Sequence, residues 1–270
     1  MNLSTSAFYI FVGIFAYLIV AVGTAVLVKK TGGSLKEIAG RTATNVLLLG
    51  GAANLIILVF TLLLVVELDK MPLSALGFSF SSRDSLFALA GAASTVLLAI
   101  AFVRWRRRGQ SSNGVQPAAA NPVGTRQLII GLVVLLLVVV QEELLYRGYV
   151  TLNLAQLNAA WVLIVTTIIF VLIHFLTNRV GRYQIVSWTV SGLILAGAYL
   201  VSGSIWVPII LHLATDLTNV LVFRITGQPA ADPAGTAVSA KDRAVYRVLY
   251  GAAMLILFLA FYKPAMIRLF

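Results

Sequence analysis

Only two histidines occur in the 270 residues of this chain, His174 and His212, and both lie in long apolar stretches. Three of the nine acidic residues, Glu142, Glu143 and Asp216, lie in stretches of the same kind. An ionisable side chain at membrane depth costs roughly 2.5–3.5 kcal/mol on insertion scales, so several of them in apolar helices need a reason. Carboxylates and imidazoles together can move protons, activate water or bind a metal. Chemistry is therefore the first hypothesis for these five residues.

The composition indicates that the apolar stretches are membrane spans. The chain is 60% hydrophobic and 11% charged, with a mean hydropathy of +0.98, whereas soluble domains carry about 25% charged residues. We predict an all-α, polytopic membrane helical bundle with about eight transmembrane helices, integral to the cell membrane and surrounded by membrane lipid. Apolar runs bounded by charged or turn residues place the spans at 7–28, 44–66, 85–103, 127–149, 159–177, 185–202, 204–223 and 244–262.

The net charge of +11 is interpreted as a topology signal, and no nucleic-acid partner is expected. Fifteen of the twenty lysines and arginines fall in loops on one side of the eight spans, and five fall on the other side. The positive-inside rule then predicts that both termini face away from the cytoplasm. The same count places the end of the fourth span, which carries Glu142, toward the outside.

The two neighbouring glutamates are expected to have different roles. Residues four apart share a helix face, so Glu143 is expected to pair with Arg147 and to be structural. Glu142 points about 100° away and shares its face with Tyr146, which leaves its carboxylate available to take and return a proton. The alternative is that both carboxylates merely cap the outer end of a helix in water.

The two histidines lie in separate motifs, Phe170-x-x-x-His174 and His212-x-x-x-Asp216. A lone histidine on an apolar helix can be a packing residue, and the second motif can bind a divalent metal, orient a water or form a buried hydrogen bond. If the spans bring Glu142 to both histidines and Asp216, the set would suit a tetrahedral zinc ion with one open position. Glu142 could also activate water without a metal. Either route leads to hydrolysis.

Three motifs, each on its own span, resemble those of the CPBP family of intramembrane proteases. They are Glu142-Glu143-x-x-x-Arg147, Phe170-x-x-x-His174 and His212-x-x-x-Asp216. That family comprises the type II CAAX prenyl endopeptidases and the bacteriocin-processing and self-immunity proteins. The resemblance covers residues 127–223 and implies an intramembrane endopeptidase, metallo- or glutamate-dependent, that acts on a membrane-associated peptide or protein.

Carried over by position, Glu142 would activate the attacking water, with Glu143 and Arg147 in support. His174 and His212 would hold the water or a metal and stabilise the developing oxyanion. The third motif commonly ends in Asn in the family, and here it ends in Asp216. This departure adds a negative charge and leaves two alternatives open: zinc held by Glu142, His174, His212 and Asp216, or a metal-free site.

We expect one membrane domain in three parts. Residues 1–126 form N-terminal transmembrane helices without a motif, residues 127–223 form the catalytic core, and residues 224–270 form a loop and the last transmembrane helix. Two other function classes remain as alternatives: a proton-coupled membrane transporter, for which no inverted repeat is visible, and a noncatalytic scaffold of the same fold. The absence of cysteine excludes thiol nucleophiles and thiolate metal sites.

The expected position of Glu142 bears on the substrate. CAAX processing acts on cytosolic, prenylated C-termini, whereas the distribution of basic residues places the end of the fourth span toward the outside. A substrate other than a prenylated cytosolic tail is therefore favoured.

Overall fold

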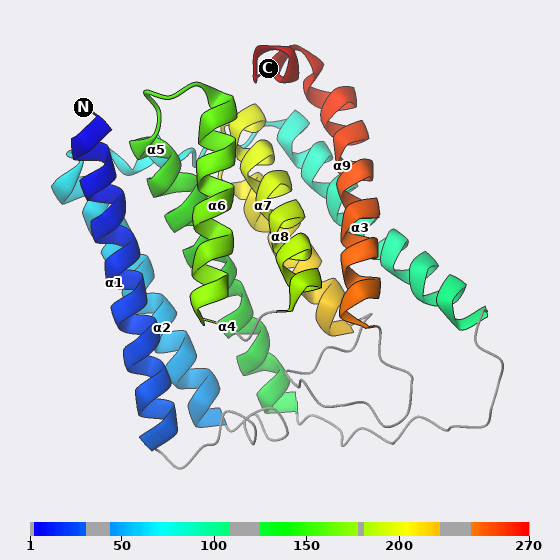
Figure 1. Cartoon of the computed structure of the whole chain (residues 1–270), viewed down its shortest axis with the longest axis horizontal. Helices are drawn as coiled ribbons and strands as arrows, with labels where there is room; N and C mark the ends of the chain where they lie inside the picture. The colour runs from blue at the N-terminus through cyan, green and yellow to red at the C-terminus, as the bar shows by residue number, and fades with distance from the viewer. Residues whose placement is uncertain (1–2, 31–43, 109–124, 178–180, 222–238, 270) are drawn as a thin grey trace.

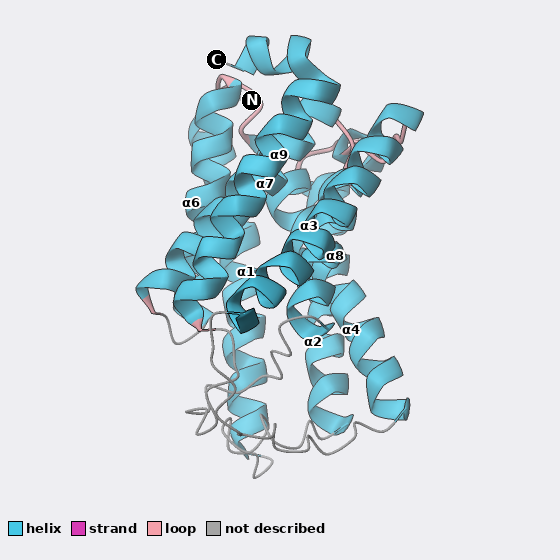
Figure 2. Cartoon of the chain, turned by 90° about the vertical axis from the view of Figure 1, so that its right-hand side faces the viewer, coloured by secondary structure: helices cyan, strands magenta, loops and turns pink. Residues whose placement is uncertain are grey.

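The computed structural model describes residues 3–30, 44–108, 125–177, 181–221 and 239–269, and within these ranges every regular element is a helix (Figures 1 and 2). The long helices are α1 (Leu3–Lys30), α2 (Thr44–Leu63), α3 (Ser82–Arg108), α4 (Thr125–Glu143), α6 (Ala159–Thr177), α7 (Arg182–Ser202), α8 (Trp206–Leu221) and α9 (Ala240–Leu269). The short ones are η1 (Leu64–Leu68), η2 (Leu73–Leu76), η3 (Leu144–Val150) and α5 (Thr151–Asn153). The predicted all-α fold class is confirmed.

The arrangement of the long helices is that of a multi-pass membrane protein. Seven helical segments of the described chain are long and apolar enough to cross a membrane, and α8 is shorter, with 16 described residues. Each predicted span coincides with one long helix, and the two chain ends lie at the same end of the bundle (Figure 1). Aromatic side chains on α1, such as Phe11 at 61% exposure, face outward, as expected where lipid replaces water.

Small residues let the helices around the functional residues approach closely. A methyl group on Gly192 of α7 would lie 2.9 Å from Cγ2 of Thr167 on α6, and one on Gly251 of α9 would lie 2.9 Å from Cγ1 of Val190 on α7. Glycine therefore brings α7 into contact with both neighbours, a common device in membrane interfaces, where packing rather than water drives association.

A tight turn joins α7 to α8, as the Ser202-Gly203-Ser204 sequence indicates. Gly203 ends α7 in the left-handed region (φ +66°), where a side chain would be strained. The backbone N–H of Ile205 then donates to the carbonyl oxygen of Gly77 (2.8 Å), and Nε1 of Trp206 donates to that of Phe78 (3.0 Å). The loop before α3 thus fixes where α8 begins.

Helix α4 does not end near Glu142. The chain remains helical through η3, a wider turn, and through α5, so the apolar segment runs continuously from Thr125 to Asn153. Glu142 therefore lies within a helix of the bundle, and neither it nor Glu143 caps a helix end in water. The predicted span, 127–149, ends four residues before Asn153, and Glu142 lies well inside the helical segment.

The last helix begins at a reciprocal cap. The hydroxyl of Ser239 donates to Oδ2 of Asp242 (2.8 Å), and the backbone N–H of Asp242 donates back to the Ser239 hydroxyl (3.1 Å). This capping pattern satisfies N–H groups that a helix start leaves unpaired. It starts α9 early enough for Arg243 and Arg247 to lie in its first two turns.

Candidate active site

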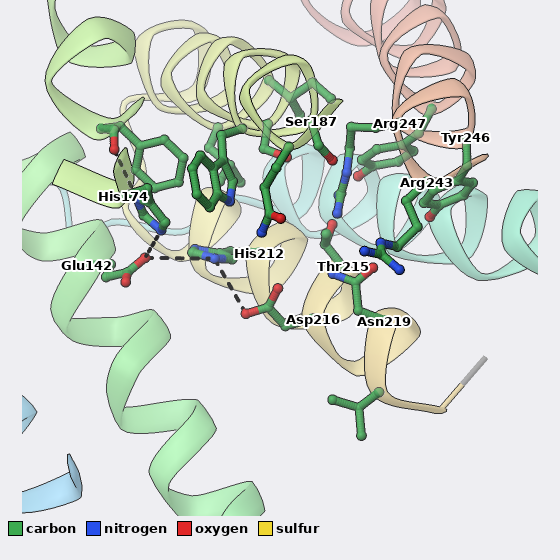
Figure 3. Close-up of a pocket in the computed structure, with 18 of the residues that line it drawn as sticks. Glu142, His174, Ser187, His212, Thr215, Asp216, Asn219, Arg243, Tyr246 and Arg247 are labelled. Atoms are coloured by element: carbon green, nitrogen blue, oxygen red, sulfur yellow. Dashed lines mark hydrogen bonds and ion pairs between the residues drawn. The ribbon is translucent and has the colours of Figure 1, made fainter. Parts of the chain in front are cut away.

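A cavity of about 350 Å³ lies between α4, α6, α7, α8 and α9. Glu142, His174, His212 and Asp216 all line it, and Figure 3 shows Glu142 and the two histidines together at one end. The volume is within the range of small-ligand pockets, roughly 300–1,000 Å³. The sequence motifs of three separate helices therefore meet in one space.

Glu142 is the point on which the two imidazoles converge. Its Oε2 lies 3.9 Å from Nε2 of His174 and 4.0 Å from Nε2 of His212. These separations are too long for direct hydrogen bonds. A water molecule placed between the three atoms would be within hydrogen-bonding reach of each, because polar groups more than about 3.5 Å apart are commonly bridged in this way.

The ring of His174 is fixed by its own helix. Its Nδ1 lies 2.9 Å from the carbonyl oxygen of Phe170, and since a carbonyl only accepts, Nδ1 carries the hydrogen. The imidazole also packs between the ring of Phe170, with centroids 4.2 Å apart, and that of Trp188, at 5.1 Å. The Nε2 atom is thereby directed toward Glu142, which explains why a phenylalanine one turn earlier belongs to this motif.

The ring of His212 is fixed by a neighbouring helix. Its Nδ1 donates to Oε1 of Glu143 across 2.6 Å, and the same oxygen accepts from Nη1 of Arg147 at 3.0 Å. Glu143 and Arg147 are fully buried, and the guanidinium lies 4.5 Å from the ring centre of Phe170. The expected Glu143–Arg147 pair is therefore present. The contact from Glu143 to His212 was missed by the sequence analysis, because it joins residues 69 apart.

Asp216 is more loosely placed than the other acids. Its Oδ2 lies 3.6 Å from Nε2 of His212, beyond hydrogen-bond distance, and its side chain is 30% exposed. It lies on the face of α8 that lines the cavity, one turn beyond His212 (Figure 3). It contributes charge to the site rather than a fixed contact.

The separations around Glu142 can be compared with a zinc shell. Ligands about 2.0–2.1 Å from a tetrahedral ion are about 3.3 Å from one another, shorter than the 3.9 and 4.0 Å found here. Among the described residues, no three His, Asp or Glu side chains are arranged to hold a metal. As placed, these residues do not fit zinc, and no reaction step is derived through a metal. The zinc alternative stays a prediction.

Helix α9 supplies lining residues that the sequence analysis assigned otherwise. Arg243 and Arg247, interpreted as loop charges, line the cavity, together with Tyr246 and Tyr250 (Figure 3). The predicted span began at residue 244, too late to include the first turn of the helix. The Ser239-x-x-Asp242 cap was the signal that could have corrected this start.

Comparison with known protein families bears on the same segment. Residues 124–218 match the family model described as type II CAAX prenyl endopeptidase, Rce1-like. About a third of the chain is therefore similar to this protease family. The matched segment includes all three motifs and ends before α9. No individual curated protein matches the chain.

The matched segment, which is similar to CAAX-type endopeptidase domains, lies within the multi-pass helical bundle. The cavity lies toward one end of the bundle, because Tyr183, Gln184 and Arg243 in the first turns of α7 and α9 line it. That end is opposite the two termini (Figure 1), and the described residues Arg182, Lys241 and Arg243 lie there. The end of the fourth span, at α5, lies at the same end as the termini (Figure 1), and its outward placement stays a prediction.

Proposed function

We propose that the cavity hydrolyses a peptide bond of a membrane-associated substrate with a water molecule activated by Glu142. One observation carries the proposal: both imidazole Nε2 atoms converge on the same carboxylate oxygen, at 3.9 and 4.0 Å, while both Nδ1 atoms are held by other groups. Three groups with fixed directions around one small space constitute a preorganised water site.

In the proposed reaction Glu142 removes a proton from the water as its oxygen bonds to the scissile carbonyl carbon, giving a tetrahedral oxyanion. Collapse of this intermediate breaks the C–N bond, and Glu142 returns the proton to the leaving nitrogen. The products are a carboxylic acid and an amine, with Glu142 restored. General acid–base catalysis by one positioned side chain contributes typically 10²- to 10⁴-fold.

The histidines have complementary parts in this scheme. The Nδ1 hydrogen of His174 is donated to the Phe170 carbonyl, and in the proposed reaction its Nε2 accepts a hydrogen bond from the water. His212, held by Glu143 on one side, turns Nε2 toward the same place and, when protonated, donates to the oxyanion. Arg147 holds the Glu143 carboxylate in position, so that Arg147 supports the reaction through His212.

Substrate reaches this site from the basic end of the bundle, where the first turns of α7 and α9 line the cavity. Under the positive-inside rule this end is cytoplasmic. A cytosolic, membrane-associated tail is therefore a compatible substrate. The argument against such a tail, which assumed that Glu142 faces outward, no longer applies.

The experiment uses the purified full chain in liposomes and pools of N-acetylated apolar heptapeptides, with products read by mass spectrometry. The parent should produce internal cleavage, and it should do so equally after exhaustive dialysis against EDTA and 1,10-phenanthroline, because no step requires a metal. Loss of activity on chelation, restored by Zn²⁺, would contradict the metal-free scheme. The absence of any cleaved peptide would reject the proposed function.

A further inference from the structure

Arg247 has no part in the reaction described above, yet it lies in the same cavity. The residue is 6% exposed, its side chain extends from α9 toward Thr215 of α8 (Figure 3), and both residues line the cavity wall. Arginine does not lose its charge in proteins, so it cannot avoid the cost of burial by releasing a proton. A buried guanidinium in a membrane bundle therefore requires an anionic or hydrogen-bonding partner.

Within the described part of the chain, this partner is missing. The Nε hydrogen of Arg247 is buried without an acceptor, and the guanidinium joins no ion pair there. The guanidinium lies 5.7 Å from the ring centre of Tyr246, near the outer limit of a cation–π interaction. Asp216 acts on Arg247 only through its electrostatic field, while its carboxylate lies beside His212.

The surroundings of Arg247 are suited to a carboxylate. A second cation, Arg243, lines the same end, so positive charge outweighs the single acid Asp216 there (Figure 3). Thr215 and Asn219 follow His212 on the cavity face of α8 and add a hydroxyl and an amide to this end. Planar guanidinium groups with hydroxyl and amide donors are the usual set for recognising a carboxylate.

We propose that Arg247 is a specificity-determining residue that binds a carboxylate of the substrate peptide, at the end of the cavity away from Glu142. This inference rests on the proposed function and names the substrate class: peptides that carry a carboxylate near the cleaved bond. The carboxylate can be the C-terminus of the peptide or the side chain of an Asp or Glu.

The distance along α8 between the two ends of the cavity limits how far the bound carboxylate can be from the scissile bond. From His212 to Thr215 and Asn219, α8 rises about 1.5 Å per residue, which places the carboxylate site roughly 5 to 10 Å along the helix from the reacting end. An extended peptide covers at most about 3.3–3.6 Å per residue. The bound carboxylate therefore belongs within about three residues of the scissile bond.

Binding is tested without catalysis in Glu142→Gln protein reconstituted in liposomes. The probes are three pools of N-acetylated apolar heptapeptides: free acids, C-terminal amides, and amides with one glutamate at each position in turn. The acid pool or the glutamate pool should bind and raise the thermal midpoint more than the neutral amides do. Preference for the acids identifies a terminal carboxylate, and preference for the glutamate amides identifies a side chain. Equal binding of all three pools would overturn the proposal.

Adding Arg247→Met to this protein should weaken carboxylate binding roughly 10- to 100-fold, the range for a lost hydrogen bond to a charged group, and leave binding of the neutral amides unchanged. Arg247→Gln is a second neutral variant in case the first does not fold. Lys263→Met, which removes an exposed cation from the same helix outside the cavity, is the matched control and should keep the preference. A folded neutral Arg247 variant that keeps the carboxylate preference would overturn the proposal.

The cleavage assay separates this inference from the proposed function. With Glu142 intact, Arg247→Met should lower kcat/KM for carboxylate-bearing peptides and still cleave neutral ones. A parent that binds carboxylates through Arg247 but hydrolyses nothing would refute the proposed function alone. A parent that hydrolyses acids, amides and glutamate amides equally would refute the Arg247 assignment alone.

Discussion

Two arginines are buried among the described residues of this bundle, Arg147 at 1% and Arg247 at 6% exposure, and their surroundings differ. Arg147 donates to Glu143 at 3.0 Å and lies over the ring of Phe170. Arg247 faces the cavity without an ion-pair partner among the described residues. The two residues belong to opposite ends of one site, and only Arg147 lies within the segment that matches the protease family.

The contrast distinguishes residues that hold the catalytic groups in place from a residue that binds substrate. Around Glu142, each supporting group already has a protein partner: Phe170 holds His174, and Glu143 holds both His212 and Arg147. Such partners fix directions before substrate arrives, which is what preorganised catalysis requires. At the α9 end, Arg247 has no ion-pair partner among the described residues, and the proposal assigns this role to a carboxylate of the substrate.

The largest effect on protein stability should come from replacing Arg147, the arginine paired with Glu143. Arg147→Met leaves Glu143 charged and buried with its compensating partner gone, and breaking such a pair costs about 3–5 kcal/mol. The amount of folded protein in membranes and its thermal midpoint should both fall. The matched variant Arg247→Met removes an unpaired cation and should fold as the parent does. Equal thermal midpoints for the parent and Arg147→Met would show that the Glu143–Arg147 pair does not stabilise the fold.

The next effect concerns the oriented imidazole. His212→Gln keeps polarity near Glu143 but cannot donate to the oxyanion as an imidazolium, so the rate of peptide hydrolysis should fall roughly 100-fold. Initial rates on the same peptide pool, at equal concentrations of folded protein, measure this. A variant that keeps more than a tenth of the parental rate would remove His212 from the mechanism.

The smallest effect is expected at Asp216. Its carboxylate is 3.6 Å from His212 and partly exposed, so Asp216→Asn removes charge without breaking a hydrogen bond. The hydrolysis rate should remain within about tenfold of the parent. A loss of 100-fold or more would place Asp216 among the groups that touch the reacting atoms, and would make the departure from the usual asparagine of this motif functionally important.

The same contrast shows what the sequence could reveal. Short-range helix geometry was enough to pair Glu143 with Arg147 and to place His212 beside Asp216, because residues four apart share a face. Charged residues at the ends of apolar runs were enough to predict the eight long helices. The bond from Glu143 to His212 depends on how α8 packs against α4, which no local pattern encodes.

Arg247 was assigned to a loop because a basic residue near a span boundary ordinarily reports topology. The predicted span 244–262 already contained Arg247, and the cap formed by Ser239 and Asp242, which starts α9 at Ala240, also brings Arg243 into the helix. The end of the fourth span was also predicted too early, at residue 149, whereas α5 continues the helix to Asn153. Helix ends, rather than helix identities, were the weak part of the sequence analysis.

The central claim is that Glu142 is the base that activates water. The most direct measurement is the single-turnover rate of peptide hydrolysis by Glu142→Gln relative to the parent, with the thermal midpoints of both proteins measured in the same liposomes. Glu67→Gln, the same change at an exposed carboxylate outside the cavity, is the control and should behave as the parent. The account predicts an unchanged midpoint and a rate lower by roughly 10²- to 10⁴-fold. A folded Glu142→Gln protein that hydrolyses peptides at a rate near that of the parent would contradict it.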